Sequence, residues 1–440
     1  MTGIDATRRA LTALAMTRSR EAKRALLIPE ILTNILDHLS KDDPASAAKA
    51  ILVSRMWFDC GIISLWRCAD HTILHSIPVR DSSRRQRYAS CVRNMTVNAT
   101  PDNFPQYGGS AESASGEEPL DFSQLHTLDF RYSTRVGNSN AGRATVPNIS
   151  ERSLVRRYLV PSLKSFSTQG LYRAGNYNLP TRLAAYCPNL EIFIFKNGLD
   201  IYLSFWWRIF VERCRDNEDF VAAVNLPALK NLPKLRHVEI DGLFEGGATA
   251  LLRSLMALPD LKTLIMGMEG YRCIQGSAAP RGPVAVSCYV GPRGQPKPFP
   301  SLASFTLGPI CPRGARDLLS YLPSTLTSLE LELENRQPDL QLAWLDEVLE
   351  AIVAFQDLRR LNLTFIHPRP IPRHGLLGLC RLKKLRYFGF DFGTGFTQQI
   401  WPDDYNVWRV PSITTELRDA FPAECDLVWN LWGTKTLITE

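Results

Sequence analysis

The 440-residue chain lacks long hydrophobic runs, paired cysteines and the short motifs of common catalytic sites. No apolar stretch approaches the roughly 20 residues that a membrane-spanning helix needs, so we expect no membrane partner. The ten cysteines are scattered with no C-x-x-C pair, which favours reduced thiols in the cytosol or nucleus over a disulfide framework or a zinc site. Phosphate-loop, nucleophile-elbow, dinucleotide-binding and zinc-protease motifs are missing as well. The sequence therefore predicts a protein that is not an enzyme and needs no cofactor or metal.

The composition is that of a globular protein, with 45% hydrophobic and 22% charged residues, and the length allows two or more domains. The net charge of +7 is unevenly placed. Residues 1–25 carry six basic and two acidic side chains, a net of +4, and residues 80–93 carry five and one, also +4. A basic N-terminal arm suits nucleic acid, anionic lipid or an import receptor. A solvated lead-in to the next segment is the simpler interpretation, and we expect no nucleic-acid partner.

Residues 26–70 carry the pattern of three short helices. Pro29 fits the first turn of a helix, and aliphatic residues then recur at helical spacing through Leu39. The Asp42-Asp43-Pro44 run is a second start signal, an acidic cap followed by proline. Trp57 and Trp66 bracket a third helical stretch. Because some forty residues are few for a self-sufficient core, part of this apolar surface is predicted to serve a partner.

This segment resembles an F-box, in the order Ile28-Pro29-Glu30-Ile31-Leu32, Ile35-Leu36, Leu39, Val53-Ser54-Arg55, Trp57 and Leu65-Trp66. Ile28 stands where leucine is usual, and Ser54 where cysteine is usual. The resemblance implies docking on the Skp adaptor of a cullin–RING ubiquitin ligase and, through it, on cullin. The residues it assigns to adaptor binding, or to the core behind it, are Ile28, Pro29, Ile31, Leu32, Ile35, Leu36, Val53, Trp57, Leu65 and Trp66. The alternative interpretation is a plain three-helix packing unit.

A phrase with apolar residues at positions one, four and six recurs along the rest of the chain. Its nine occurrences span 125–130, 163–168, 190–195, 235–240, 261–266, 302–307, 326–331, 358–363 and 385–390. Thr168 is the one exception, at a sixth position. A leading leucine followed by a period-two apolar pair predicts a short strand entered from a turn. Nine such units at intervals of 24 to 45 residues indicate a solenoid.

The phrase resembles the L-x-x-L-x-L strand signature of leucine-rich repeats. The array is irregular because the length of the repeat varies and because the usual asparagine or cysteine after each strand is absent. Helical connectors are predicted at 151–159, 181–187, 213–224, 247–257, 313–321, 341–355 and 374–381. The fold class we expect is α/β: a three-helix F-box followed by an irregular leucine-rich-repeat-like solenoid.

The side chains predicted to face outward from the sheet lie between and just after the inward apolar pairs. They are Asp129, Arg131, Ser167, Gln169, Ile194, Lys196, Glu239, Asp241, Ile265, Gly267, Thr306, Gly308, Glu330, Glu332, Asn362, Thr364, Gly389 and Asp391. This set is mixed in charge and poor in arginine. It fits a protein target better than a phosphate backbone, whose binding needs clustered cations.

The pattern divides the chain into five parts. These are a basic arm (1–25), the F-box-like module (26–70), a linker with a first irregular repeat (71–120), the solenoid (121–390) and a C-terminal cap (391–440). Residues 99–121, 133–149 and 267–300 are predicted insertions, rich in small or polar residues, glycine and proline. Four tryptophans in 391–440 favour a cap over the last repeat. His71 and His75 stand four apart, but no further ligand completes a metal site.

Two functions follow from this organisation. The first is a non-enzymatic substrate receptor of a Skp–cullin–F-box ubiquitin ligase, in which the helical module binds the adaptor and the repeats bind a protein target. The second is a repeat scaffold without ligase association, whose helical module caps the first repeat. Exposure of the Ile28–Leu36 apolar stripe favours docking, and its burial against the repeats favours a cap.

Overall fold

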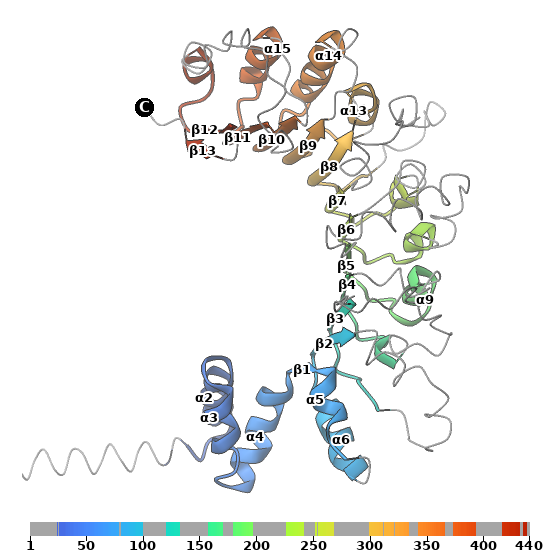
Figure 1. Ribbon diagram of the computed structural model, residues 1–440, viewed down its shortest axis with the longest axis vertical. Helices are drawn as coiled ribbons and strands as arrows, with labels where there is room; N and C mark the ends of the chain where they lie inside the picture. The colour runs from blue at the N-terminus through green and yellow to red at the C-terminus, as the bar shows by residue number, and fades with distance from the viewer. Residues whose placement is uncertain are drawn as a thin grey trace, which may run out of the picture. The chain divides into compact units, whose positions relative to one another are not determined.

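The computed structural model describes residues 24, 26–78, 81–99, 120–132, 157–169, 179–196, 226–241, 251–252, 254–267, 299–310, 312–320, 322–333, 342–365, 373–392, 416–431 and 434–437 (Figure 1). The chain forms two compact units. The first contains residues 1–135 and 151–163, and the second contains residues 136–150 and 164–440. The three N-terminal helices therefore belong to the same compact unit as the first strands of the repeat region.

The first unit begins with three helices, α2 (Pro29–Asp42), α3 (Pro44–Ala50) and α4 (Arg55–Trp66). Helices α2 and α3 begin where the sequence predicts, and α4 begins at Arg55, two residues before Trp57. Pro29 and Pro44 occupy first-turn positions, and the Asp43 carboxylate accepts a hydrogen bond from the backbone N–H of Ser46. The Ser54 hydroxyl in turn accepts one from the backbone N–H of Trp57 at 3.3 Å. The structure thus contains three helices in this segment.

Three parallel strands complete the first unit: β1 (Cys68–Asp70), β2 (Asn94–Ala99) and β3 (Thr127–Tyr132), with helices α5 (His71–His75) and α6 (Ser82–Ala89) between β1 and β2. Of these three strands, only β3 overlaps one of the nine predicted phrases. The strand β2 has the same pattern of buried apolar residues, with Val92, Met95 and Val97 at positions one, four and six. Valine and methionine in place of leucine hid it from the sequence pattern.

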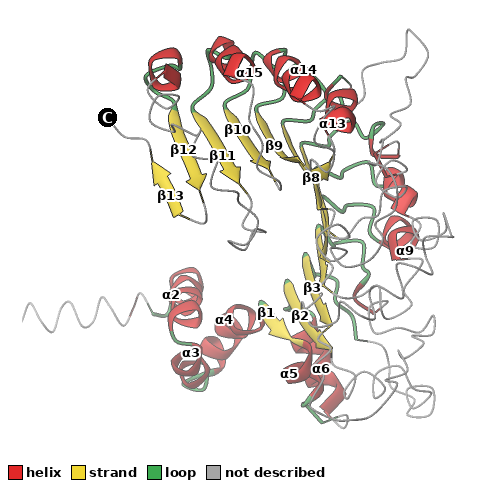
Figure 2. Cartoon of the chain, turned by 45° about the horizontal axis from the view of Figure 1, so that its top comes forward, coloured by secondary structure: helices red, strands yellow, loops and turns green. Residues whose placement is uncertain are grey.

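The second unit is a sheet whose strands are hydrogen-bonded in chain order (Figure 2). They are β4 (Ser165–Gln169), β5 (Ile192–Lys196), β6 (His237–Asp241), β7 (Thr263–Gly267), β8 (Ser304–Ile310), β9 (Ser328–Leu333), β10 (Arg360–Phe365), β11 (Tyr387–Phe392), β12 (Asp426–Leu431) and β13 (Thr434–Leu437). All neighbours from β4 to β12 pair in parallel, and β13 pairs antiparallel with β12. The α/β class and the strands that the repeat phrase predicts are confirmed.

Helical connectors cover one side of this sheet. They are α9 (Leu179–Tyr186), the 3-10 turn η5 (Leu226–Asn231), α13 (Pro312–Leu319), α14 (Leu342–Val353), α15 (Arg373–Gly378) and η7 (Leu379–Arg381). Figures 1 and 2 draw α13, α14 and α15 side by side on the same side of β8–β11. Four predicted connectors, 181–187, 313–321, 341–355 and 374–381, coincide with these helices. The connector predicted at 213–224 lies outside the described residues.

The core lies between the strands and these helices. In every one of the nine phrases the residues at positions one, four and six are buried, including Thr168, because alternate strand residues point to the same side. Apolar residues of α14 such as Val348, Leu349 and Ile352 are fully buried as well. The leucine-rich phrase therefore marks the inner layer of the sheet from β3 to β11.

The segment predicted as a C-terminal cap contributes two strands to the described sheet. After the short helical stretch that contains Leu417, the buried side chains of Phe421, Cys425 and Leu427 lead into β12. The segment thus adds one more parallel strand before the antiparallel β13. Trp401, Trp408 and Trp432 lie outside the described residues, as do nearly all of the basic arm and the predicted insertions. In the part of the chain described above, no helix combines the length and apolar character needed to cross a membrane.

Candidate docking surface on the N-terminal helices

Helix α2 has two apolar faces, one buried and one exposed. Leu32 and Leu36 are fully buried, and α2 packs on α4. Ile28, Ile31 and Ile35 instead keep 45%, 39% and 41% of their surface exposed. The spacing of three and four residues places these three isoleucines on one side of the helix. Burial of the Leu32 face inside the helical module therefore leaves the isoleucine face uncovered.

Close packing of α2 on α4 depends on Gly61. A side-chain carbon at this position would lie 2.9 Å from Cδ1 of Leu36 and would overlap Cγ2 of Ile51. Ile62 and Ala47 fill the rest of this small core. The absence of a side chain at Gly61 thus lets the three helices approach closely enough to bury Leu32 and Leu36.

More exposed aliphatic side chains lie at the ends of the helices. Leu52 and Val53, in the turn between α3 and α4, keep 78% and 69% of their surface exposed, and Leu27 before α2 keeps 67%. Ile63 of α4 is also exposed. Large exposed aliphatic residues gathered on one small module are typical of a protein interaction site. We call Leu27, Ile28, Ile31, Ile35, Leu52 and Val53 the aliphatic set.

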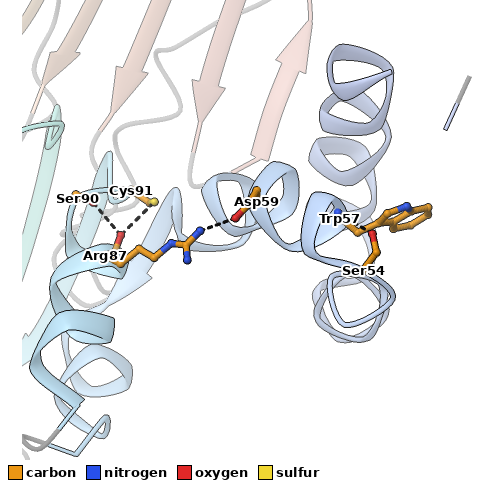
Figure 3. A network of polar contacts seen from close by, with 6 residues as sticks. All are labelled: Ser54, Trp57, Asp59, Arg87, Ser90 and Cys91. Atoms are coloured by element: carbon orange, nitrogen blue, oxygen red, sulfur yellow. Dashed lines mark hydrogen bonds and ion pairs between the residues drawn. The ribbon is translucent and has the colours of Figure 1, made fainter. Parts of the chain in front are cut away.

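Helix α4 contacts helix α6 through an ion pair, a cation–π contact and an aromatic stack. We call these contacts the seam. The Nη2 group of Arg87 lies 2.6 Å from Oδ1 of Asp59 (Figure 3), and its guanidinium carbon lies 4.9 Å from the centre of the Phe58 ring. The Trp66 ring stacks on Tyr88, with 4.4 Å between ring centres. Tyr88 is buried. The seam therefore fixes the third helix of the module against the first repeat.

Asp37 adds a polar contact between α2 and the end of α4. Its Oδ1 accepts a hydrogen bond from the hydroxyl of Ser64, and its Oδ2 lies 3.5 Å from the Arg67 guanidinium. The carbonyl of Arg67 in turn accepts hydrogen bonds from the backbone N–H groups of Arg93 and Asn94 at the start of β2. A continuous set of contacts thus runs from the middle of α2 to the sheet of the first unit.

The ten residues that the F-box resemblance selects differ in their solvent exposure. Five are exposed: Ile28, Pro29, Ile31, Ile35 and Val53. Leu32 and Leu36 lie in the core, while Trp57, Leu65 and Trp66 are half-buried, with Trp66 stacked on Tyr88. Leu27, Leu52 and Ile63 are exposed aliphatic residues that the resemblance did not select. Leu27 and Leu52 could have been added to the predicted docking residues because each directly precedes a matched residue, Ile28 or Val53.

Among the described residues, no group of three or more His, Cys, Asp or Glu side chains is placed to hold a metal ion. His71 is buried and its Nδ1 contacts the hydroxyl of Tyr158. The pKa of Asp43 is lowered, chiefly by its hydrogen bonds from Ser46, which matches its role as a helix cap.

The second surface available for recognition is the outward side of the sheet in the second unit. The register places Glu239, Ile265, Thr306, Glu330, Asn362 and Gly389 in one row across β6–β11. All six alternate with the buried positions of their strands, as predicted. Comparison with known proteins adds no family assignment, since neither protein-family models nor curated proteins gave a match.

Proposed function

We propose that the protein is a substrate receptor of a Skp–cullin–F-box ubiquitin ligase. In this proposal the aliphatic set binds the Skp adaptor, and the outward side of the repeat sheet binds the protein to be ubiquitinated. The observation that carries the proposal is the exposed isoleucine face of α2. It lies on a three-helix module whose sequence resembles an F-box and whose own core is already filled by Leu32 and Leu36.

Burial of the aliphatic set would supply the binding energy. Fully burying an aliphatic side chain contributes about 1.5–3 kcal/mol, so three isoleucines with about half of their surface available supply a few kcal/mol. The remaining affinity would come from Leu27, Leu52 and Val53, which are exposed to a greater extent. The module does no bond chemistry in this role, because its contribution is to hold a target near the ubiquitin donor.

The alternative is a repeat scaffold in which the module only caps the first repeat. The seam between α4 and α6 favours this alternative, since Trp66 and Arg87 do cover the start of the repeat region. A cap does not account for the isoleucine face of α2, which faces away from the buried core of the module. A cap and a docking site are also compatible, with α4 serving the first role and α2 the second.

The test is binding of the full chain to a purified Skp adaptor. We expect the double variant Ile31→Asp/Ile35→Asp to lose at least tenfold in affinity while its circular dichroism spectrum stays unchanged. Both positions are exposed, so the substitution spares the core. A substitution at Leu32 would not be informative, because that residue is buried and its loss would unfold the module.

A matched control is Ile73→Asp on α5, an isoleucine with 56% of its surface exposed that lies outside the aliphatic set. This variant should bind the adaptor as the unchanged chain does. Retained binding in the double variant, or no binding by the folded unchanged chain, would overturn the proposal. Point variants are preferable to removal of residues 1–70, because truncation would uncover Tyr88 in the seam.

A further inference from the structure

The outward side of β6–β11 carries five carboxylates in two neighbouring rows. These are Glu239 and Asp241 on β6, Glu330 and Glu332 on β9, and Asp391 on β11. The twelve positions of the two rows hold no lysine or arginine. The preceding row adds His237 and Arg360, and the Arg360 guanidinium lies over the Tyr387 ring at 4.5 Å. This acidic face stands out because the chain as a whole has a net charge of +7.

Two glycines form the floor between the acidic strands. Gly267 and Gly308 are paired in register on β7 and β8. A side-chain carbon at Gly267 would lie 2.6 Å from Oδ1 of Asp241, and one at Gly308 would lie 2.8 Å from Oε2 of Glu332. Each carboxylate therefore leans from its own strand over the glycine of the next strand. The space that these two carboxylates occupy is free of side chains from β7 and β8 at this register position.

Contacts within the sheet position two of the other carboxylates, Glu239 and Glu330. Oε1 of Glu239 lies 2.9 Å from Nζ of Lys196 on β5, and Oε1 of Glu330 accepts a hydrogen bond from the Asn362 amide at 3.1 Å. Burial, followed by the nearby Glu239 carboxylate, raises the pKa of Asp241. A partly desolvated carboxylate beside another carboxylate gains most from an added cation.

We propose that this acidic face binds a basic segment of a protein partner, with lysine or arginine side chains seated at β6 and β9. Ile265 and Thr306 between the acidic pairs would contact the aliphatic stems of such side chains. The inference rests on the proposed function only where it calls this partner the ubiquitination target. Charge complementarity selects the occupant, since an acidic segment or a nucleic acid would be repelled by all five carboxylates.

The strand spacing sets the spacing of the basic residues. Neighbouring strands lie about 4.8 Å apart, so the acidic pairs on β6 and β9 are separated by about 14 Å. An extended chain advances about 3.3 Å per residue. A segment that crosses the strands in extended form therefore matches both pairs when its basic residues stand about four positions apart.

The experiment uses the full chain and three dye-labelled twelve-residue peptides. The first has lysines four positions apart, the second has the same lysines at adjacent positions, and the third has glutamate in their place. We expect fluorescence anisotropy to show binding to the first peptide, at least fivefold weaker binding to the second and no binding to the third. Binding should weaken as salt is raised from 50 to 300 mM.

The variants Glu239→Gln/Asp241→Asn and Glu330→Gln/Glu332→Gln should each lose at least tenfold in affinity for the first peptide. The matched control is Asp357→Asn/Glu424→Gln, which changes the charge equally. Asp357 and Glu424 lie in the turns before β10 and β12, outside the acidic face, and pair with Lys384 and Arg386 before β11. Equal loss in the control variant, or equal binding of the lysine and glutamate peptides, would overturn the inference.

Adaptor binding measured on the same variants separates the two proposals. The acidic-face variants should bind the Skp adaptor as the unchanged chain does, because their substitutions lie in the second unit. If the chain binds the lysine peptide but no adaptor, the proposed ligase role is refuted and the proposed binding by the acidic face is supported. If the chain binds the adaptor but not the lysine peptide, the acidic face fails and the ligase role stands.

Discussion

Arg87 of α6 donates from Nη2 to Oδ1 of Asp59 on α4 at 2.6 Å, and the same two helices are joined by the stacking of Trp66 on buried Tyr88. The Arg87 and Asp59 side chains are about half-exposed, at 51% and 50%. Pairs with this exposure contribute up to about 1 kcal/mol because water and salt screen them. The stacking of Trp66 on buried Tyr88 is therefore the stronger part of the seam.

The seam predicts unequal effects for two neighbouring substitutions. Arg87→Ala should lower the free energy of unfolding of the first unit by less than about 1 kcal/mol. Tyr88→Ala should lower it by about 3 kcal/mol, since large buried aromatic residues are costly to truncate. Hydrogen exchange of the α4 and α6 amides measures both. A larger effect from Arg87→Ala than from Tyr88→Ala would contradict this account of the seam.

Gly61 and Gly378 predict opposite effects of the same change to alanine. A methyl group at Gly61 would overlap Ile51 and crowd Leu36, whereas one at Gly378 in α15 would meet nothing within 4 Å. Gly61→Ala should therefore cost about 1–3 kcal/mol of stability by overpacking. Gly378→Ala should add about 0.5–1 kcal/mol because alanine favours the helix. Thermal unfolding of the two variants tests the pair, and stabilisation by Gly61→Ala would show that α2 and α4 pack less closely.

Sequence patterns predicted most of the helices and strands, but they predicted less well which residues are exposed. Proline and side-chain caps mark the starts of α2, α3 and α4 because these signals are local. The nine strands were predictable because a period-two apolar pair is buried wherever one side of a sheet is covered. β2 was missed because Val92, Met95 and Val97 serve the same purpose with other side chains.

The exposure of individual residues could not be derived from the same patterns. Leu32 and Ile31 are adjacent apolar residues in one stripe, yet the first is buried and the second is exposed. Their difference depends on where α4 lies, and Gly61 sets that position from 29 residues further along the chain. The acidic face has a similar origin. Asp241 and Glu332 are 91 positions apart in sequence, and only the strand register brings each beside one of two glycines that are paired on neighbouring strands.

The raised pKa of Asp241 predicts a pH-dependent effect of Asp241→Asn. Because burial raises the pKa of this carboxyl in the folded state, the folded protein holds its proton more tightly than the unfolded chain does. The charged side chain therefore costs stability as pH rises from the ordinary aspartate range through the raised pKa. Asparagine, which stays neutral, removes this cost.

Asp241→Asn should accordingly raise the free energy of unfolding at pH 7 and change it less at pH 4. Denaturant titrations at several pH values between these two would give the difference curve. Asp357→Asn is the control with the opposite sign, since the hydrogen bond and charge of Lys384 lower the pKa of Asp357. A difference curve for Asp241→Asn that falls as pH rises would contradict the assignment of the raised pKa to burial.

Thr168 is the one polar residue at an inward position of the nine phrases, and it predicts a stabilising substitution. Its side chain is fully buried, and its hydroxyl oxygen has no hydrogen-bond partner in the described part of the chain. A buried polar group without a partner costs about 1–3 kcal/mol, and a substitution that removes the group recovers part of this. Thr168→Val keeps the shape and should raise the free energy of unfolding by about 1 kcal/mol. Thr364→Val, on the outward side of β10, should change it by less than about 0.5 kcal/mol. Destabilisation by Thr168→Val would mean that the hydroxyl has a partner after all, such as a bound water molecule between β4 and the helical layer.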